Sequence, residues 1–394
     1  MNTDLKNFEF SGKMQKISIV LIVLGIAASV ASFSIDKTVG WVDFIVNNLY
    51  FVTLAASGIF ILSLAGVLQA SWLAPYKRIP EAMTKYLPVG FVLMLCVYFG
   101  SHTIYEWTHT EMVANDPILS AKAGYLNITG FMGRMVVIFL VWIVIAKRLT
   151  GLSVKQDTDD SQSLIEKITL NSVISLILYS LSFCVAAFDW YMSVEPHWFS
   201  TIFGVYVFAG AFVTAFAFIT IIVIKLKDWG YFEGVINENH LHDLGKWMFG
   251  FSTFWAYIWL SQYLLIWYAN IPEETEYYVL RGNDWNAIFF FNLIINWLAP
   301  FFLLMTRKAK RSPKRLMFVA TLIIIGHFID TYLMIAPKVF HHAHAHITGF
   351  GSLQLLQWLG YLGLFIFVTG KALAKKNLVA IGDPNLDEGI HLHQ

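Results

Sequence analysis

The chain has 394 residues, of which 57% are hydrophobic and only 13% are charged, whereas a water-soluble domain carries about 25% charged residues. This composition excludes an ordinary soluble enzyme, and the formal net charge of +1 leaves no strong basic field for binding nucleic acid. The sequence therefore predicts an all-α, polytopic membrane protein in which residues 1–394 form a single membrane domain embedded in lipid.

Ten apolar stretches are long enough to cross a bilayer, since a transmembrane helix needs about 20 mostly apolar residues. In chain order, the predicted spans are residues 15–34, 46–73, 86–106, 124–146, 168–189, 203–225, 247–270, 286–305, 315–336 and 350–371. A polar stretch at 155–163 separates the fourth and fifth spans without adding a soluble domain.

Lysine and arginine are distributed unevenly between the two sides of these spans. Of the 27 basic residues, 22 lie in the N-terminal tail, in the loops that follow even-numbered spans or in the C-terminal tail. Four lie on the opposite side, namely Lys37, Lys122, Arg281 and Lys338, and the remaining one, Arg134, lies inside the fourth span. Because basic loops are retained in the cytoplasm, we expect a multi-pass protein with both termini cytoplasmic.

The two cysteines, Cys96 and Cys184, both lie inside predicted spans, and the sequence contains no CxxC or CxxCH motif. Thiolate ligation of an iron–sulfur cluster and covalent attachment of a c-type haem are therefore excluded. A b-type haem would need two facing histidines, for which His102 and His327 are the weak candidates. We expect this chain to bind no redox cofactor itself.

Ionisable residues gather in the half of the membrane opposite the basic loops. Such residues are costly near hydrocarbon, so they indicate either a proton or quinone pocket or ion pairs that hold helices together. The candidate pocket residues are His102, Glu106, Arg134, Asp189, Glu195, His197, His327 and Asp330. We expect His102, Glu106, Arg134, Asp189 and Asp330 to line one connected pocket, in which Arg134 pairs with at least one acid.

A histidine-rich stretch, HHAHAH, lies on the same outer side. Alternating histidines can bind zinc or copper, but a surface cluster without a fixed scaffold is non-specific. Its members, His341, His342, His344 and His346, are therefore weak metal candidates, and no other metal site is predicted.

The stretch FDWYMSVEPHWFSTIFGVYVFAGAF, from Phe188 to Phe212, joins the fifth and sixth spans. Its order of Asp189, Trp190 and Tyr191, followed by Glu195, Pro196, His197 and Trp198, resembles the corresponding segment of the NrfD-like membrane subunits of bacterial alternative complex III. The resemblance covers nearly the whole chain and is greatest to the F subunit of that complex. Asp189 matches the acid that ends the fifth span in the family motif.

The resemblance implies two four-helix bundles, here residues 46–189 and 203–336, with peripheral helices at 15–34 and 350–371. It also implies a place in the bacterial cytoplasmic membrane within a respiratory electron-transport complex. The expected partners are a second NrfD-like subunit, an iron–sulfur subunit and multihaem c-type cytochromes, with a terminal oxidase as a further candidate. Haem c and iron–sulfur clusters would then belong to the partners, and quinol is a candidate ligand of this chain.

These observations predict an integral membrane subunit of a quinol:electron acceptor oxidoreductase that contributes a quinone-associated or proton-conducting pocket. Whether the chain itself is catalytic stays open. Two alternatives remain: an independent proton-coupled transporter, which needs no partner, and a purely structural scaffold subunit of the complex.

Overall fold

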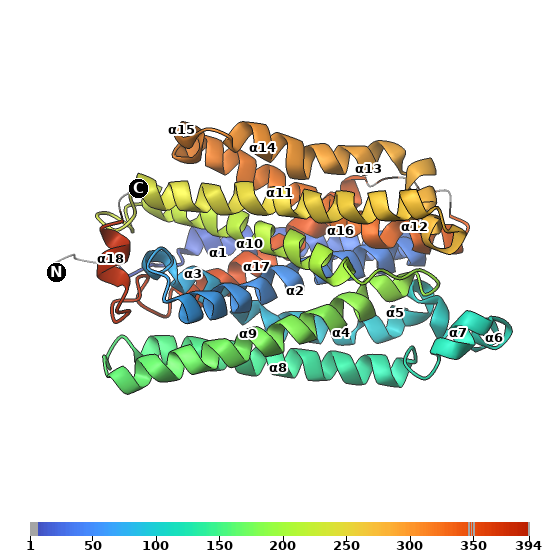
Figure 1. Cartoon of the computed structure of the whole chain (residues 1–394), viewed down its shortest axis with the longest axis horizontal. Helices are drawn as coiled ribbons and strands as arrows, with labels where there is room; N and C mark the ends of the chain where they lie inside the picture. The colour runs from blue at the N-terminus through green and yellow to red at the C-terminus, as the bar shows by residue number, and fades with distance from the viewer. Residues whose placement is uncertain (1–6, 346, 348, 350, 393–394) are drawn as a thin grey trace.

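The computed structural model describes residues 7–345, 347, 349 and 351–392, and within this part of the chain every regular element is helical. The long helices lie roughly parallel and form an elongated bundle (Figure 1). The predicted all-α fold is therefore confirmed.

Eight helices or helix groups in the described residues are long and apolar enough to cross a membrane. They are α1 (Gly12–Ile35), α2 (Lys37–Leu68), α8 (Ile128–Lys155), α9 (Gln162–Trp190), α10 (Phe203–Asp228), α13 with α14 (Asn286–Leu293 and Ala299–Leu304), α16 (Pro313–His342) and α17 (Ser352–Leu373). A ninth span results if the helix group Ala74–Leu95, which ends in α4 (Leu87–Leu95), is counted as one with α5 (Val97–Ile104), from which it is bent by 59° at Cys96.

The prediction of ten spans is therefore wrong, and the described helices support eight to nine. The predicted span 247–270 lies in α11 (Glu238–Ala269), which is long enough to cross but is not among the sufficiently apolar helices. Four tryptophans and three tyrosines replace aliphatic residues along α11, and their polar ring atoms lower its hydropathy. The predicted span 86–106 is broken at Cys96, whose N–H bonds to Leu93 O only three residues back.

Shorter helices join the long ones. They are η1 (Ala74–Tyr76), α3 (Arg78–Met83), η2 (Thr84–Tyr86), η3 (Glu106–Thr108), α6 (Thr110–Asn115), α7 (Pro117–Lys122), η4 (Met192–Val194), α12 (Pro272–Asn283), a π-helical turn η5 (Ile294–Leu298), α15 (Arg307–Lys310) and α18 (Leu386–Ile390).

Helices α2, α10 and α16 form the buried centre of the molecule, and they pack against one another. Helix α2 also contacts α4, α8 and α9, while α10 and α16 contact α11, and α14 packs on both α11 and α16. Because α2 packs across both predicted bundles, the division at 46–189 and 203–336 stays a prediction.

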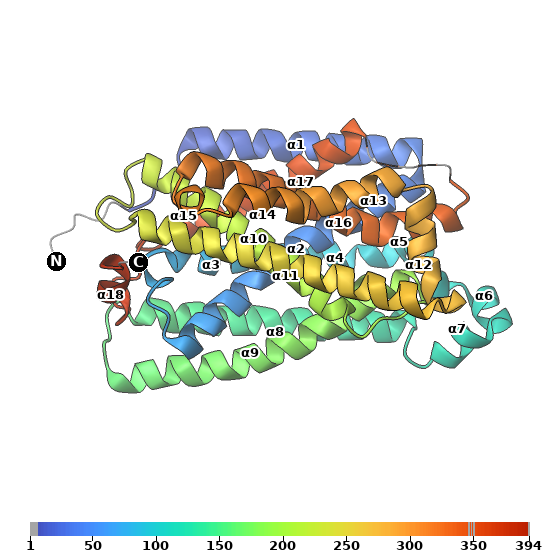
Figure 2. The same ribbon diagram turned by 45° about the horizontal axis from the view of Figure 1, so that its top comes forward.

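Helices α1 and α17 pair with each other along one side of the bundle (Figure 2). At their crossing a Cβ added to Gly25 would lie 2.4 Å from Gly360 Cα, so glycine is required for this approach. Close crossings of this kind are how membrane helices gain packing contacts without a hydrophobic driving force.

The bundle has two distinct ends, named here the α12 end and the α18 end. Helices α6, α7 and α12 lie at one end, and α3, α15 and α18 lie at the other (Figures 1 and 2). Both described chain ends pack at the α18 end: the ring of Phe8 lies 5.4 Å from that of Tyr231, and Asn239 Nδ2 donates to Leu392 O. The structure thus supports a multi-pass protein with both ends of the described chain on one side.

Candidate functional site

The segment between α9 and α10 lies at the α12 end and begins with a buried ion pair. Asp189, in the last turn of α9, is fully buried, and its Oδ2 accepts from Arg134 Nε of α8 at 2.6 Å. The Arg134 guanidinium also lies 3.8 Å from the centre of the Tyr125 ring. Burial and then the Asp189 carboxylate raise the pKa of Tyr125 to about 12. The prediction that Arg134 pairs with an acid is confirmed.

A second ion pair ties the same segment to α12 and α16. Arg281 Nη2 donates to Glu195 Oε1 at 2.7 Å, and both side chains are almost inaccessible. Arg281 Nε also donates to Leu333 O at 2.8 Å. Leu333 O lacks its usual helical donor because Pro337, four residues later in α16, has no N–H. Burial lowers the pKa of Arg281, but the Glu195 carboxylate and the neighbouring Tyr277 and Tyr278 together raise it above its ordinary value.

Glu106 belongs to a third group of charges. Its Oε1 lies 3.4 Å from Lys338 Nζ and 3.3 Å from His342 Nδ1. Lys338 Nζ also lies 3.3 Å from Glu276 Oε1. These contacts join η3, α12 and α16 at the α12 end, so Lys338 and Glu106 serve as a link between three elements.

Asp330 lies inside the bundle, within a fourth polar group. Its Oδ1 accepts from Tyr206 Oη at 2.5 Å and from Asn292 Nδ2 at 2.8 Å, and its Oδ2 accepts from Trp255 Nε1 at 3.2 Å. His327 Nδ1 is 3.7 Å from Asp330 Oδ2. Asn292 precedes the π-helical turn η5, and π-helical turns are frequent at functional sites.

The remaining predicted histidines lie nearer the surface. His102 is exposed, and its Nδ1 is 3.1 Å from Thr108 Oγ1. His197 Nε2 bonds to Asp116 Oδ2 at 2.5 Å, and this hydrogen bond lowers the pKa of Asp116.

The predicted metal candidates do not gather into a ligand set. His341 and His344 line a pocket of about 330 Å³ beside α12, His342 contacts Glu106, and His346 lies outside the described residues. The described chain contains no group of three or more potential metal-ligating histidine, cysteine or acidic side chains.

Of the five residues expected in one pocket, Arg134 and Asp189 are in direct contact. Glu106 and Asp330 each bond to a separate set of partners, and His102 bonds to Thr108. Direct contacts therefore do not join the five residues into one group, because each buried acid already accepts from its own donors on neighbouring helices.

An open groove of about 680 Å³ lies beside the ion pair of Asp189. Phe188, Met192, Trp198 and Phe199 belong to its apolar lining, together with Ile118, Tyr125, Leu126 and Pro196. Trp198 is fixed in place because its ring stacks on Tyr277 at 4.3 Å and its Nε1 donates to Glu274 O.

The polar lining of the groove includes Lys122, Ser193, His197, Glu273 and Glu276. Lys122 Nζ donates to Pro196 O at 2.5 Å, and burial lowers the pKa of Lys122.

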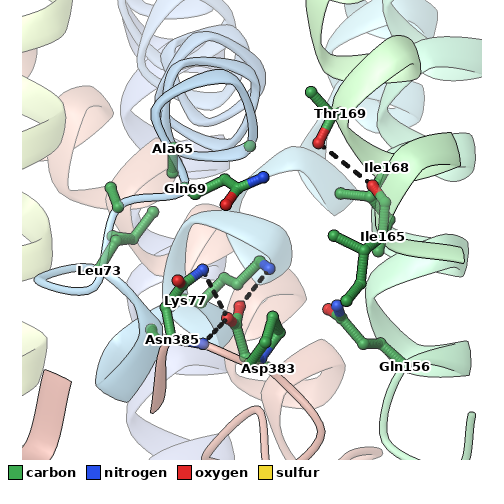
Figure 3. Close-up of a pocket in the computed structure, with 14 residues that line it drawn as sticks. Ala65, Gln69, Leu73, Lys77, Gln156, Ile165, Ile168, Thr169, Asp383 and Asn385 are labelled. Carbon is green, nitrogen blue, oxygen red and sulfur yellow. Dashed lines mark hydrogen bonds and ion pairs between the residues drawn. The ribbon is translucent and has the colours of Figure 1, made fainter. Parts of the chain in front are cut away.

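The C-terminal tail packs across the α18 end of the bundle. No sequence pattern predicted this packing. Lys77 Nζ bonds to Asp383 Oδ2 at 2.6 Å beside a small pocket of about 30 Å³ lined also by Gln69, Gln156 and Thr169 (Figure 3). The tail also reaches α11, where His240 Nε2 donates to Gly389 O at 2.8 Å.

Asp43 is a further residue that sequence reasoning missed. It lies in α2, three residues before the predicted start of the span at residue 46, and it is buried. Its Oδ2 accepts from Ser32 of α1 and from Gln354 and Gln357 of α17. Arg281 was missed as well; the signal that could have found it is Pro337 inside an otherwise regular apolar helix.

No protein-family model matches the chain, and no curated protein matches it. In the described residues, the fold and the helix hydropathies define the class as a polytopic, all-helical integral membrane protein with eight to nine candidate spans.

Proposed function

We propose that this chain is an integral membrane subunit of a bacterial quinol:electron acceptor oxidoreductase of the alternative complex III type, and that its groove receives the quinone ring. The observation that carries the proposal is the groove of about 680 Å³ formed by the segment that resembles the NrfD-like subunits. Its volume falls within the range of about 300–1,000 Å³ that is usual for small-ligand sites.

The chemistry of the groove suits a quinone ring. Aromatic and thioether side chains of Phe188, Met192 and Trp198 offer apolar faces, and His197 lies at the polar part of the lining with Asp116 as its partner. A quinol releases two electrons and two protons when it becomes a quinone. In this proposal His197 takes up one of the two protons, a role for which imidazole is suited near neutral pH, the second proton is released to water at the open groove, and both electrons pass to the redox centres of the partners.

The partners in this proposal hold the redox centres. They are an iron–sulfur subunit, multihaem c-type cytochromes and a second NrfD-like subunit, with a terminal oxidase as a further candidate. The complex lies in the cytoplasmic membrane with the α18 end in the cytoplasm, where the basic loops are expected, and with the groove on the opposite side, where the electron acceptors would lie.

The proposal is tested by filling the groove. We expect Met192→Trp in the assembled complex to reduce photolabelling of residues 188–199 by an azido-quinone at least tenfold and to slow quinol oxidation. The matched control is Leu181→Trp, because Leu181 is 65% exposed on α9 and is not a groove residue; it should label as wild type. Labelling that is unchanged in Met192→Trp would refute the quinone groove.

Purification from native membranes tests the membership in a complex separately. We expect an affinity-tagged chain to co-purify with c-type haem absorbance at 550 nm on the order of one equivalent or more of haem per chain. A chain that leaves the membrane alone and without haem, under detergents that keep other respiratory complexes intact, would contradict the proposal and favour an independent transporter.

A further inference from the structure

A small cavity of about 20 Å³ lies between the central helices, away from the groove. Its lining comes from α2, α10 and α16 together with Tyr191, and it includes Tyr50, Thr214, His327 and Asp330. A cavity of this size accommodates about one water molecule, for which about 10–15 Å³ is enough, provided that polar partners surround it.

His327 gives this cavity an unusual lining. Its ring is only 3% exposed, and neither ring nitrogen has a hydrogen-bond partner among the residues that the structure describes. The Trp255 ring packs edge to face against it at 5.2 Å. A buried imidazole without partners is costly, so both nitrogens favour a small polar ligand in the cavity that they border.

The hydroxyl groups around the cavity present oxygen acceptors. Thr214 Oγ1 donates to Gly210 O at 2.7 Å, Thr331 Oγ1 donates to His327 O at 2.9 Å, and Tyr50 Oη donates to Ile324 O at 2.6 Å. Since each hydroxyl hydrogen is already used, the lone pairs of the three oxygens are what these groups can offer. The ligand that fits such a lining is a hydrogen-bond donor.

The charge of the site is set by Asp330. Its two oxygens accept from Tyr206, Asn292 and Trp255, an arrangement that suits a buried carboxylate anion. The titratable side chains that the surrounding elements place near it are Tyr50 of α2, Tyr191, Tyr206 of α10 and Tyr277 of α12, and none of these four is a cation. His327 Nδ1, at 3.7 Å from Asp330 Oδ2, is therefore placed to carry the balancing positive charge.

We propose that His327, Asp330 and one water in this cavity form a proton-binding site at the junction of α2, α10 and α16. The proton resides on His327, the water accepts from the imidazolium N–H and donates to the threonine oxygens, and Asp330 balances the charge. The bound species is an excess proton carried by imidazole and water. The site is independent of the quinone groove, because it shares no lining residue with it.

The experiment uses the full-length protein in lipid bilayers with ¹⁵N-labelled histidine and solid-state NMR. We expect a His327 imidazole signal, assigned by its loss in His327→Gln, that shows magnetisation exchange with water and converts from the neutral to the doubly protonated form on acidification. We expect Asp330→Asn to reduce the proton affinity of His327 at least tenfold. Water exchange that is absent in wild type, or titration that is unaffected by Asp330→Asn, would overturn the proposal.

Two glycine-to-alanine variants, one beside the cavity and one control, test the water site without altering a titratable group. A Cβ on Gly210 would lie 3.1 Å from His327 Nδ1, whereas a Cβ on Gly133, in α8, would meet no atom within 4 Å. We expect Gly210→Ala to abolish the exchange between water and His327, and Gly133→Ala to leave it as in wild type. Exchange that persists in Gly210→Ala would show that the cavity is not the site of the water.

Discussion

Replacing Arg281 by methionine should destabilise the protein strongly, because Arg281 satisfies both a buried acid and a break in a helix. Its guanidinium donates to Glu195 Oε1 at 2.7 Å, to Leu333 O at 2.8 Å and to Met334 O at 3.1 Å. Methionine keeps much of the side-chain volume but leaves the buried Glu195 carboxylate without the cation that is hydrogen-bonded to it.

The magnitude follows from these contacts. Leaving one partner of a buried ion pair unpaired costs about 3–5 kcal/mol, and a buried carbonyl left without a donor costs about 1–3 kcal/mol. Because the same side chain provides both contacts, these costs overlap and are not summed. We therefore expect Arg281→Met to lower the free energy of unfolding by at least about 3 kcal/mol.

The assay is equilibrium unfolding by SDS in mixed micelles, followed by circular dichroism. The double variant Arg281→Met with Glu195→Leu removes both charges and should recover part of the loss, as replacing a whole buried pair by apolar residues often does. The control is Lys155→Met, since the Lys155 side chain is 62% exposed in its pair with Asp159; its effect should be within about 0.5 kcal/mol. An Arg281→Met variant as stable as wild type, or a double variant less stable than the single one, would refute the reasoning.

Three further predictions concern other parts of the molecule. Asp43→Asn should change the free energy of unfolding by less than about 1 kcal/mol, because no cation pairs with this acid in the described residues and an amide oxygen can still accept from its donors. Asp43→Ala removes the acceptor and should lower the free energy of unfolding by about 1–3 kcal/mol. Equal losses in both variants would be evidence against this prediction. Burial lowers the pKa of His240 below 6.5, so the unfolded chain takes up a proton more readily than the folded one. Docking of the C-terminal tail is therefore stabilised above pH 6.5 and weakened as the pH falls below it. Limited proteolysis of the tail should accelerate on acidification in wild type but not in His240→Gln, and a wild-type rate that does not change with pH would contradict the prediction. Single cysteines at Asn283 and Ser161 should react with impermeant reagents from opposite sides of the membrane, and labelling of both from outside intact cells would exclude the topology.

The sequence predicted the helical class and most of the transmembrane segments because apolar composition and helix length are local properties. The predicted span 203–225 and the helix α10 (Phe203–Asp228) begin at the same residue. The span count was wrong where local composition is ambiguous: α11 has the length but carries tryptophan and tyrosine in place of aliphatic residues, and the helix that was predicted for residues 86–106 bends at Cys96.

The partners of the buried charges could be predicted only in part. The sequence indicated that Arg134 needs an acid, since an unpaired guanidinium inside a membrane is costly. It could not choose Asp189 among the candidate acids, because that choice depends on how α8 and α9 pack side by side. The role of Arg281 was missed for a related reason: its acid lies 86 residues away in the chain, and its two carbonyl partners lie 52 and 53 residues away.

The sequence by itself determined that this chain is a multi-pass membrane protein and that a polar, aromatic segment joins α9 to α10. These features follow from the free-energy cost of placing charges and unpaired backbone groups in hydrocarbon. That cost applies to each residue separately, whatever its neighbours in the fold are. The tertiary structure decided that the ionisable residues divide into separate groups, that the 188–199 segment borders a groove and that His327 faces a cavity between α2, α10 and α16. Those outcomes depend on helix packing, in which residues far apart in the chain become neighbours.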